Sequence, residues 1–296
     1  MSKATLLHNP KAGEKSYTKK ELIALIENEG IKLTYSSLKE KDWDDFDKDT
    51  SFLILAGGDG SVRKVTKKLL KNNINRKYPL ALLPAGTANN IAKTLSIPER
   101  EEDVIKSWKE GVIKKFDVGR VSNVKSAHFF LESFGFGIFP VLMQKMEALD
   151  NEVLDTPDKK LTMALTIFKM LLDSFKPFQC DVVVDGVSHV GKFLLVEIMN
   201  TQSIGPNLTL SPHADPGDGE FEVIFIPEGQ KEKLQNYIEN KLNGIDDPDN
   251  FDTCKAKSVI VKCDHYLAHI DDEIIEVDNV PEVVIELDEG ALQFLI

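Results

Sequence analysis

The chain has 296 residues, of which 42% are hydrophobic, and its 36 basic and 48 acidic side chains give a formal net charge of −12. This length is enough for two domains, or for one large domain, with a proper hydrophobic core. The acidic balance argues against a nucleic-acid partner, and no uncharged apolar run approaches the roughly 18 residues of a membrane-spanning helix. The first residues carry no secretory signal, and the three cysteines are too scattered for a disulfide framework or a zinc site. We therefore expect a cytoplasmic protein.

Strand and helix patterns alternate in the first third of the chain. Thr18 and Glu21 fit a capping box at the start of a helix that Gly30 would end. The continuous apolar run 51–56 is typical of a strand that is buried on both faces of a parallel sheet. The strands expected in this region are 4–8, 31–35, 51–56 and 80–83. This succession predicts an α/β N-terminal domain with a mostly parallel sheet over residues 1–112.

Residues 113–290 contain many short strand patterns that are separated by turn residues, such as Asp185-Gly186. The strands expected there are 116–121, 128–134, 181–184, 192–199, 220–226, 258–262 and 283–287. Helical stretches interrupt them near 138–149, 158–175 and 229–243. The pattern predicts a β-rich C-terminal domain in the form of an antiparallel sandwich. The last residues, 291–296, are so apolar that we expect them to return as a strand to the first domain.

Gly57 to Ser61 form the strongest local signal, because Gly-Gly-Asp-Gly-Ser stands directly between a buried strand and a helix. Glycines let the backbone approach a phosphate closely, and the helix N-terminus offers unpaired N–H groups. The carboxylate of Asp59 would repel a phosphate, so it suits either a bridging Mg²⁺ ion or a loop-fixing hydrogen bond.

Two further loops have the same kind of composition. Asn9 to Gly13 follow the first strand, and Gly86 to Asn90 follow the strand 80–83. The carboxyl ends of parallel strands share one edge of a sheet, where ligands bind. The three loops together therefore predict a polar cradle for a nucleotide.

With these motifs the sequence resembles the diacylglycerol kinase catalytic-domain family, and within it the soluble bacterial lipid kinases. The motifs that carry the resemblance are Asn-Pro-x-x-Gly at 9–13, Gly-Gly-Asp-Gly-Ser at 57–61, Pro-Ala-Gly-Thr-Ala-Asn at 84–89, Ser-Pro-His-Ala at 211–214 leading to Asp218-Gly219, and Asp-x-Glu at 271–273. The resemblance implies the fold of the NAD kinase and diacylglycerol kinase group, with a nucleotide-binding α/β domain, a β-rich lipid-substrate domain and an active site in the cleft. It also implies transfer of the γ-phosphoryl group of ATP, with Mg²⁺, to the hydroxyl of a diacylglycerol-like lipid in phospholipid biosynthesis.

The resemblance assigns roles to individual residues. The nucleotide contacts that it implies are Asn9, Pro10, Lys11, Ala12, Gly13, Ser36, Gly58, Asp59, Gly60, Ser61 and Thr87. The metal-binding turn that it implies, partly through main-chain carbonyls, consists of Asp215, Asp218 and Glu220.

By the same resemblance Glu273 corresponds to the base that accepts the proton of the lipid hydroxyl, and we expect Asp271 to orient either this base or the metal. If both residues lie on one extended strand, their side chains share a face, and two such close carboxylates should raise the pKa of one of them. The nearby His265 and His269 lie in a strand-like pattern, and we interpret them as structural residues.

Lys64, Lys67, Lys68 and Lys71 recur at helical spacing in a stretch, 61–78, that has no acidic residue. Such a face is either solvated or binds anionic lipid headgroups, to which each cation adds about 1 kcal/mol. A lipid substrate at a membrane surface favours peripheral contact with the inner face of the membrane. The oligomeric state cannot be read from the sequence.

Two other functions stay open. Arg63 and Lys64 stand where the family usually has Asn-Glu, Asn90 replaces an Asp, and Asp272 replaces the middle Gly of Asp-Gly-Glu. These departures favour a regulator that binds nucleotide or lipid with weak or no turnover. An NAD kinase-like enzyme is the second alternative, since it shares the Gly-Gly-Asp-Gly loop but resembles the motifs at 84–89 and 271–273 less.

Overall fold

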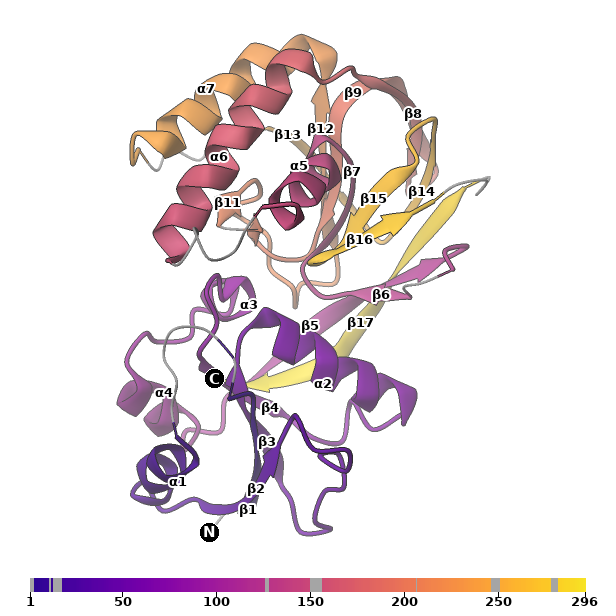
Figure 1. The fold of residues 1–296 in the computed structure, drawn as a ribbon. Helices are drawn as coiled ribbons and strands as arrows, with labels where there is room; N and C mark the ends of the chain where they lie inside the picture. Colours follow the sequence, from indigo (N-terminus) through magenta and orange to yellow (C-terminus); the bar gives the residue numbers. More distant parts are fainter. Residues whose placement is uncertain are drawn as a thin grey trace. The chain divides into compact units, whose positions relative to one another are not determined.

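The computed structural model describes residues 3–10, 12, 18–125, 128–149, 156–205, 207–245, 251–277 and 282–296. It divides into two compact units (Figure 1): unit 1 comprises Met1–Asp117 and Glu289–Ile296, and unit 2 comprises Val118–Asp288. The sequence suggests boundaries after residues 112 and 290. Two strands, β5 (Ile113–Ser122) and β17 (Val283–Leu295), run through the boundaries of the structural units.

Unit 1 is built on a parallel sheet whose strands follow the order β17-β4-β3-β1-β2. The strands are β1 (Lys3–His8), β2 (Lys32–Ser37), β3 (Phe52–Gly57), β4 (Leu80–Pro84) and the last residues of β17. Phe294 and Leu295 of β17 pair in parallel with Leu80 and Ala81 of β4. Every residue of β3 is buried, as expected for a strand that is covered on both faces.

Helices cover both faces of the unit 1 sheet (Figure 1). The helices of unit 1 are α1 (Lys19–Glu27), α2 (Asp59–Lys71), the short α3 (Asn90–Thr94) and α4 (Glu101–Ser107). Helix α1 starts at the predicted capping box, in which the Glu21 N–H donates to the Thr18 hydroxyl at 3.2 Å and the Thr18 N–H donates to the Glu21 carboxylate at 2.8 Å. Side chains of α1 and α4 form one core with alternate residues of β3.

Unit 2 is built on an antiparallel sheet in which the strands follow the order β16-β15-β7-β9-β8-β14-β17. Strand β12 extends it beside β9, and β13 pairs with β12. The strands within unit 2 are β6 (Phe129–Phe130), β7 (Ser133–Gly137), β8 (Phe178–Val184), β9 (Val187–Met199), β10 (Ser203–Ile204), β11 (Leu208–Thr209), β12 (Phe221–Pro227), β13 (Asp252–Ala256), β14 (Ser258–Cys263), β15 (Leu267–Ile270) and β16 (Glu273–Glu276). Strands β10 and β11 form a separate two-stranded sheet, and β6 pairs with β5.

The described residues of unit 2 include two hydrophobic cores. One lies between sheet faces and gathers Phe130, Phe134, Val196 and Phe221 with their neighbours. The other lies between the sheet and the helices, which are α5 (Ile138–Glu147), α6 (Pro157–Ser174), the short η1 (Glu228–Gln230) and α7 (Lys231–Leu242). The α/β domain with a parallel sheet and the β-rich antiparallel domain that the sequence predicts are both confirmed.

Among the residues that the structure describes, none of the helices combines the length and the apolar character that crossing a lipid bilayer requires.

Candidate functional site

Asn9 joins the loops that follow β1 and β3. Its side-chain amide donates to the Ser61 hydroxyl at 2.9 Å, and its backbone N–H donates to the carbonyl of Ala56 at 3.0 Å. The two strands pair in parallel, with His8 opposite Ala56, so both loops leave the same edge of the sheet. Two of the three predicted nucleotide loops therefore meet.

Gly58 and Gly86 bring the loops after β3 and β4 into backbone contact. A Cβ on Gly58 would lie 2.7 Å from the Cα of Gly86, and a Cβ on Gly86 would lie 2.5 Å from the Cα of Gly58. Asn89 closes the second loop, because its side chain accepts from the N–H of Gly86 and donates to the Gly86 carbonyl, both at 2.9 Å. The sequence suggests that Gly58 makes room for a phosphate, but the neighbouring loop already requires the missing side chain.

Asp59 connects the same loops through its carboxylate. Oδ2 accepts from the N–H of Asn90 at 3.0 Å, and Oδ1 accepts from the N–H of Ile91 at 3.1 Å. These N–H groups belong to the first turn of α3, where an acidic group is favourable. Of the two roles considered for Asp59, the structure shows the loop-fixing hydrogen bonds.

Helix α2 begins directly at the linked loops. Its N-cap is Gly58, in an extended conformation with φ −102° and ψ −171°, and no side chain caps the first N–H groups. The N-terminus of a 13-residue helix without a side-chain cap, together with the helix dipole, suits the oxygens of a phosphate group. Unit 1 thus contains a helix N-terminus framed by three polar loops.

The remaining predicted nucleotide contacts differ in their exposure and in their hydrogen bonds. Gly60 and Thr87 are exposed. Pro10 is exposed, and the N–H of Ala12 donates to the carbonyl of Asn9 at 3.0 Å. Lys11 and Gly13 lie outside the described residues.

Ser36 lies near the end of β2, opposite Leu7 of β1. Its hydroxyl donates to the carbonyl of Trp43 at 3.1 Å, so its proton is directed at the segment between β2 and β3. Its predicted role toward a nucleotide stays a prediction.

The three departures from the family pattern near the nucleotide loops are accommodated within unit 1. Arg63 is buried, with 9% of its surface exposed. The ammonium of Lys64 donates to the carbonyl of Leu38 and lies 5.9 Å from the centre of the Trp43 ring. Asn90 is buried and offers its backbone N–H to Asp59.

Asp271 anchors a turn in unit 2. Its carboxylate accepts from the backbone N–H groups of Leu131 at 3.0 Å, Glu132 at 2.8 Å and Ser133 at 3.2 Å. The residue is buried and has a left-handed backbone with φ +51°. This cluster of amides fixes the carboxylate, so Asp271 holds the start of β7 and its own turn together.

Glu273 is exposed and is the first residue of β16. Asp271 precedes it in the turn between β15 and β16, so the two residues do not share one extended strand. The condition under which both carboxylates would face the same way is therefore not met. Instead, the hydrogen bonds of Asp271 fix the turn that leads to Glu273.

The turn at 215–220 contains the three residues predicted to bind a metal. Asp215 accepts from the N–H of Gly217, and Asp218 accepts from the N–H of Glu220, both at 3.0 Å. The ammonium of Lys255 lies 2.7 Å from Asp218 and 3.2 Å from Glu220, and these two hydrogen bonds raise the pKa of Lys255.

These side chains do not fit a divalent cation as they stand, because the ammonium of Lys255 already forms ion pairs with two of the carboxylates. No group of three or more His, Cys, Asp or Glu side chains that could hold a metal occurs among the described residues. Ligation through the carbonyls of the turn stays a prediction.

Comparison with known proteins agrees with this arrangement of loops and strands. Residues 3–121 match the family model for the diacylglycerol kinase catalytic domain. Residues 148–295, half of the chain, match the model for the YegS C-terminal NAD kinase beta sandwich-like domain. The chain belongs to the diacylglycerol kinase catalytic-domain family. Members of this family are lipid kinases, which are phosphotransferases.

Individual relatives have low sequence identity to this chain, but the matches cover most of its length. The diacylglycerol kinase of Bacillus subtilis is 25% identical over 258 residues, which cover 80% of this chain and 77% of that protein. The diacylglycerol kinase of Mycobacterium tuberculosis is 26% identical over 226 residues, or 73% of this chain and 68% of that protein. A crystal structure of a diacylglycerol kinase from Bacillus anthracis shares the fold, with a TM-score of 0.72, 20% identity and coverage of 99% and 96% of the two chains.

Three residues of this lipid kinase contact the predicted site residues or lie near them, although the sequence alone does not predict them. Lys255 contacts the turn at 215–220 from β13. Lys93 lies in α3, where partial burial lowers its pKa while the carboxylate of Asp59 acts in the opposite direction. Glu197 is buried in β9, and a single acid within the apolar run 193–199 was a signal that could have found it.

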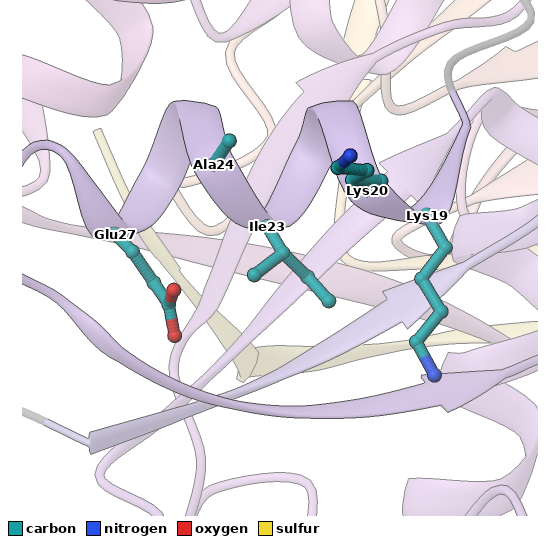
Figure 2. A pocket seen from close by; sticks show the side chains of 5 residues that line it. All are labelled: Lys19, Lys20, Ile23, Ala24 and Glu27. Carbon is teal, nitrogen blue, oxygen red and sulfur yellow. The ribbon is translucent and has the colours of Figure 1, made fainter.

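A shallow depression also occurs on α1, away from the residues discussed above. Figure 2 shows the side chains that line it: Lys19, Lys20, Ile23, Ala24 and Glu27. None of them is a predicted site residue, and the depression plays no part in the nucleotide loops.

Proposed function

We propose that this protein is an ATP-dependent lipid kinase that transfers the γ-phosphoryl group of MgATP to the hydroxyl of a diacylglycerol-like lipid. The observation that carries the proposal is the set of three polar loops, linked around the N-terminus of α2 in unit 1. The links are the side-chain contact of Asn9 with Ser61, the backbone contact of Gly58 with Gly86, and the hydrogen bonds of Asp59 to α3. Linked polar loops at a helix N-terminus that has no side-chain cap favour an anionic ligand such as a nucleotide phosphate.

Phosphoryl transfer requires a positioned donor and a base near the acceptor, with little covalent help from the protein. In the proposed reaction the lipid oxygen forms a bond to the γ-phosphorus, and the bond between that phosphorus and the β,γ-bridging oxygen breaks. ADP leaves with the electron pair of the broken bond. The carboxylate of Glu273 takes the proton of the hydroxyl, and Asp271 holds the turn that carries Glu273.

Two exposed lysines of α2 support a membrane-surface substrate. Lys64 and Lys68 are engaged within unit 1, since Lys64 donates to Leu38 and Lys68 lies 2.9 Å from Asp44. Lys67 and Lys71 are exposed on the same helix. Cations in that position favour anionic lipid headgroups as the partner of the basic face.

The proposal is tested by incubating the protein with radiolabelled ATP, Mg²⁺ and, separately, diacylglycerol, monoacylglycerol, sphingosine, phosphatidylglycerol and NAD. We expect label in diacylglycerol. Label in NAD alone would establish an NAD kinase, and ATP binding without transfer to any acceptor would establish a regulator.

The Glu273→Gln variant tests the assignment of the base. It keeps the shape of the side chain and removes its charge, so lipid phosphorylation should fall by on the order of 10²-fold or more at unchanged ATP affinity. Glu276→Gln is the matched control, because Glu276 is also exposed on β16. Equal loss of activity in both variants would show that Glu273 has no special role.

A further inference from the structure

Unit 2 contains a fully buried ion pair that the proposed reaction does not use. Nε2 of His269 lies 2.8 Å from Oε1 of Glu197, and both side chains are 0% exposed. The second carboxylate oxygen of Glu197, Oε2, has no hydrogen-bond partner among the described residues. Removing a carboxylate and an imidazole from water costs free energy, which their mutual attraction and hydrogen bonds must offset.

The register of three neighbouring strands creates the pair. Gly135 of β7 lies opposite Glu197 of β9 on one side and opposite His269 of β15 on the other. A Cβ on Gly135 would lie 1.9 Å from Oε2 of Glu197. The missing side chain of Gly135 therefore lets Glu197 and His269 meet above the central strand.

The other ring nitrogen of His269 faces Asp271. Nδ1 lies 3.0 Å from the carbonyl oxygen of Asp271, which can only accept a hydrogen bond. The carboxylate of Glu197 also accepts when it is ionised. A neutral imidazole has one N–H group, so it can donate to the Asp271 carbonyl or to the Glu197 carboxylate, but not to both. Both contacts are hydrogen bonds only if the pair holds one additional proton, on the imidazole or on the carboxyl group.

The surroundings of His269 agree with this proton count. Burial alone would lower the pKa of His269, but the charge and hydrogen bond of Glu197, with the carbonyl and charge of Asp271, raise the pKa above its usual value. Glu197 and Asp271 are the charged groups that act on the ring. Three uncharged residues also adjoin His269: Phe139 of α5 makes an edge contact with the ring, and Gly135 and Ile274 lie opposite His269 in the sheet.

The turn that begins at Asp271 is thus held at two points. Its carboxylate is fixed by the N–H groups of Leu131, Glu132 and Ser133, and its carbonyl is fixed by His269. Glu273 follows two residues later. Without the shared proton, a ring nitrogen lone pair of His269 would face an oxygen lone pair. The carbonyl of Asp271 could then lose its hydrogen bond, and only the carboxylate would hold the turn.

We propose that Glu197 and His269 are positioning residues, which share one buried proton and use it to fix the carbonyl of Asp271 and thereby the direction of Glu273. This inference rests on the proposed function in so far as Glu273 is the base. It gives a purpose to a histidine that the sequence suggests is only structural.

The shared proton can be observed without any activity measurement. In ¹⁵N-labelled full-length protein, the two ring nitrogens of His269 should titrate together at a pH above the ordinary value of about 6.5. In Glu197→Gln the ring should be neutral at pH 7, because the amide can donate to Nε2 while Nδ1–H still donates to Asp271. A wild-type ring that loses its proton below pH 6.5 would overturn the proposal, whatever the fate of the proposed reaction.

The pH profile of lipid phosphorylation separates positioning from a merely structural role. Wild-type kcat should fall on the alkaline side as the pair loses its proton, and this fall should be absent in Glu197→Gln. His269→Leu should lower kcat by about tenfold or more at every pH, with an unchanged KM for ATP. Coinciding pH profiles of wild type and Glu197→Gln would overturn the positioning role.

His265→Gln is the matched control. Nδ1 of His265 also lies close to a carbonyl two residues on, at 2.9 Å from Leu267, but burial lowers the pKa of His265. Its substitution should leave the profile of the wild type unchanged. Full activity of Glu273→Gln, together with the described titration of His269, would show that Glu273 is not the base. It would leave the shared proton of Glu197 and His269 supported.

Discussion

Gly58 and Gly86 approach each other so closely in unit 1 that neither can carry a side chain. A Cβ on Gly58 would lie 2.7 Å from the Cα of Gly86, a distance that real side chains do not adopt toward backbone. The glycines of two motifs, separated in the sequence by a helix and a strand, therefore form one structural contact. The proposed nucleotide loops keep their shape because these two positions are glycine.

Gly58→Ala should destabilise unit 1 by about 1–3 kcal/mol, since the new methyl group forces the two loops apart. ATP affinity should fall as well, because the loops frame the N-terminus of α2. Valine at this position is expected to disturb the fold, so it does not test ATP binding alone. Urea unfolding followed by tryptophan fluorescence reports on unit 1, which contains both tryptophans, Trp43 and Trp108.

Lys20→Ala provides the control for that measurement, because Lys20 is exposed on α1 of the same unit. The free energy of unfolding of this variant should change by no more than about 0.5 kcal/mol. Equal stability of Gly58→Ala and the wild type would mean that the loops can separate without cost.

Asp59→Asn should lower the thermal stability of the protein in the absence of nucleotide and metal. The asparagine has one acceptor oxygen and no charge, so it cannot hold the N–H groups of Asn90 and Ile91 equally well. We expect a loss of about 1–2 kcal/mol in the free energy of unfolding. Asp103→Asn, at an exposed site on α4, should change it little.

The same variant decides between the two roles considered for Asp59. An unchanged melting temperature together with weaker binding of MgATP would contradict loop fixing and favour a metal-bridging carboxylate.

Asp271→Asn should loosen unit 2, whereas Glu273→Gln should not. Asparagine tolerates the left-handed backbone of residue 271, so the change removes the charged acceptor without adding backbone strain. The expected loss is about 2 kcal/mol. Hydrogen exchange of the amides of Leu131, Glu132 and Ser133 should accelerate in Asp271→Asn and stay as in the wild type in Glu273→Gln. Unchanged protection in Asp271→Asn would show that the carboxylate does not hold these amides.

His8 should make unit 1 sensitive to acid. Burial and the charge of Lys39 lower the pKa of His8, which lies 3.1 Å from the Tyr35 hydroxyl. As the pH falls through about 6.5, the unfolded chain gains a proton that the folded imidazole does not take up, so the free energy of unfolding decreases. The decrease ends once the pH is below the folded pKa.

His8→Gln should remove this part of the acid sensitivity, as measured by tryptophan fluorescence in urea at pH 7.5 and pH 5.5. His128→Gln, at an exposed histidine outside unit 1, should behave as the wild type does. Parallel pH dependence in the wild type and His8→Gln would exclude His8 as the source.

Reversing the charge of Lys67 and Lys71 should weaken binding to anionic vesicles at low salt, with unchanged ATP affinity. The control is the reversal of Lys20 and Lys32, which are exposed in the same unit and change the net charge equally. Similar binding by both double variants would indicate that only the overall charge matters, and that the face of α2 is solvated.

Local patterns in the sequence predicted the elements of both units well, because those patterns reflect burial and capping. The apolar run 51–56 became the fully buried β3, and Thr18 with Glu21 became the start of α1. The three polar loops could be placed on one sheet edge because the carboxyl ends of parallel strands coincide.

Contacts between distant residues could not be predicted in this way. Glu197 and His269 are 72 residues apart, and Lys255 and Asp218 are 37 residues apart. Their meeting depends on which strands are neighbours and in what register, and a shift of one residue would send each side chain to the other face. The sequence does not predict the turn at Asp271 for a related reason. Its left-handed backbone is stabilised by the three amides of residues 131–133, which are distant in the sequence.

The pairing of β17 with β4 sets an order on folding during synthesis. Residues 289–296 complete the sheet of unit 1, although all of unit 2 lies between them and residue 117. The sheet of unit 1 therefore has an open edge beside β4 for as long as residues 118–288 are being synthesised. An unpaired strand edge is a site for aggregation, so the nascent protein is exposed to this risk in the interval before β17 emerges.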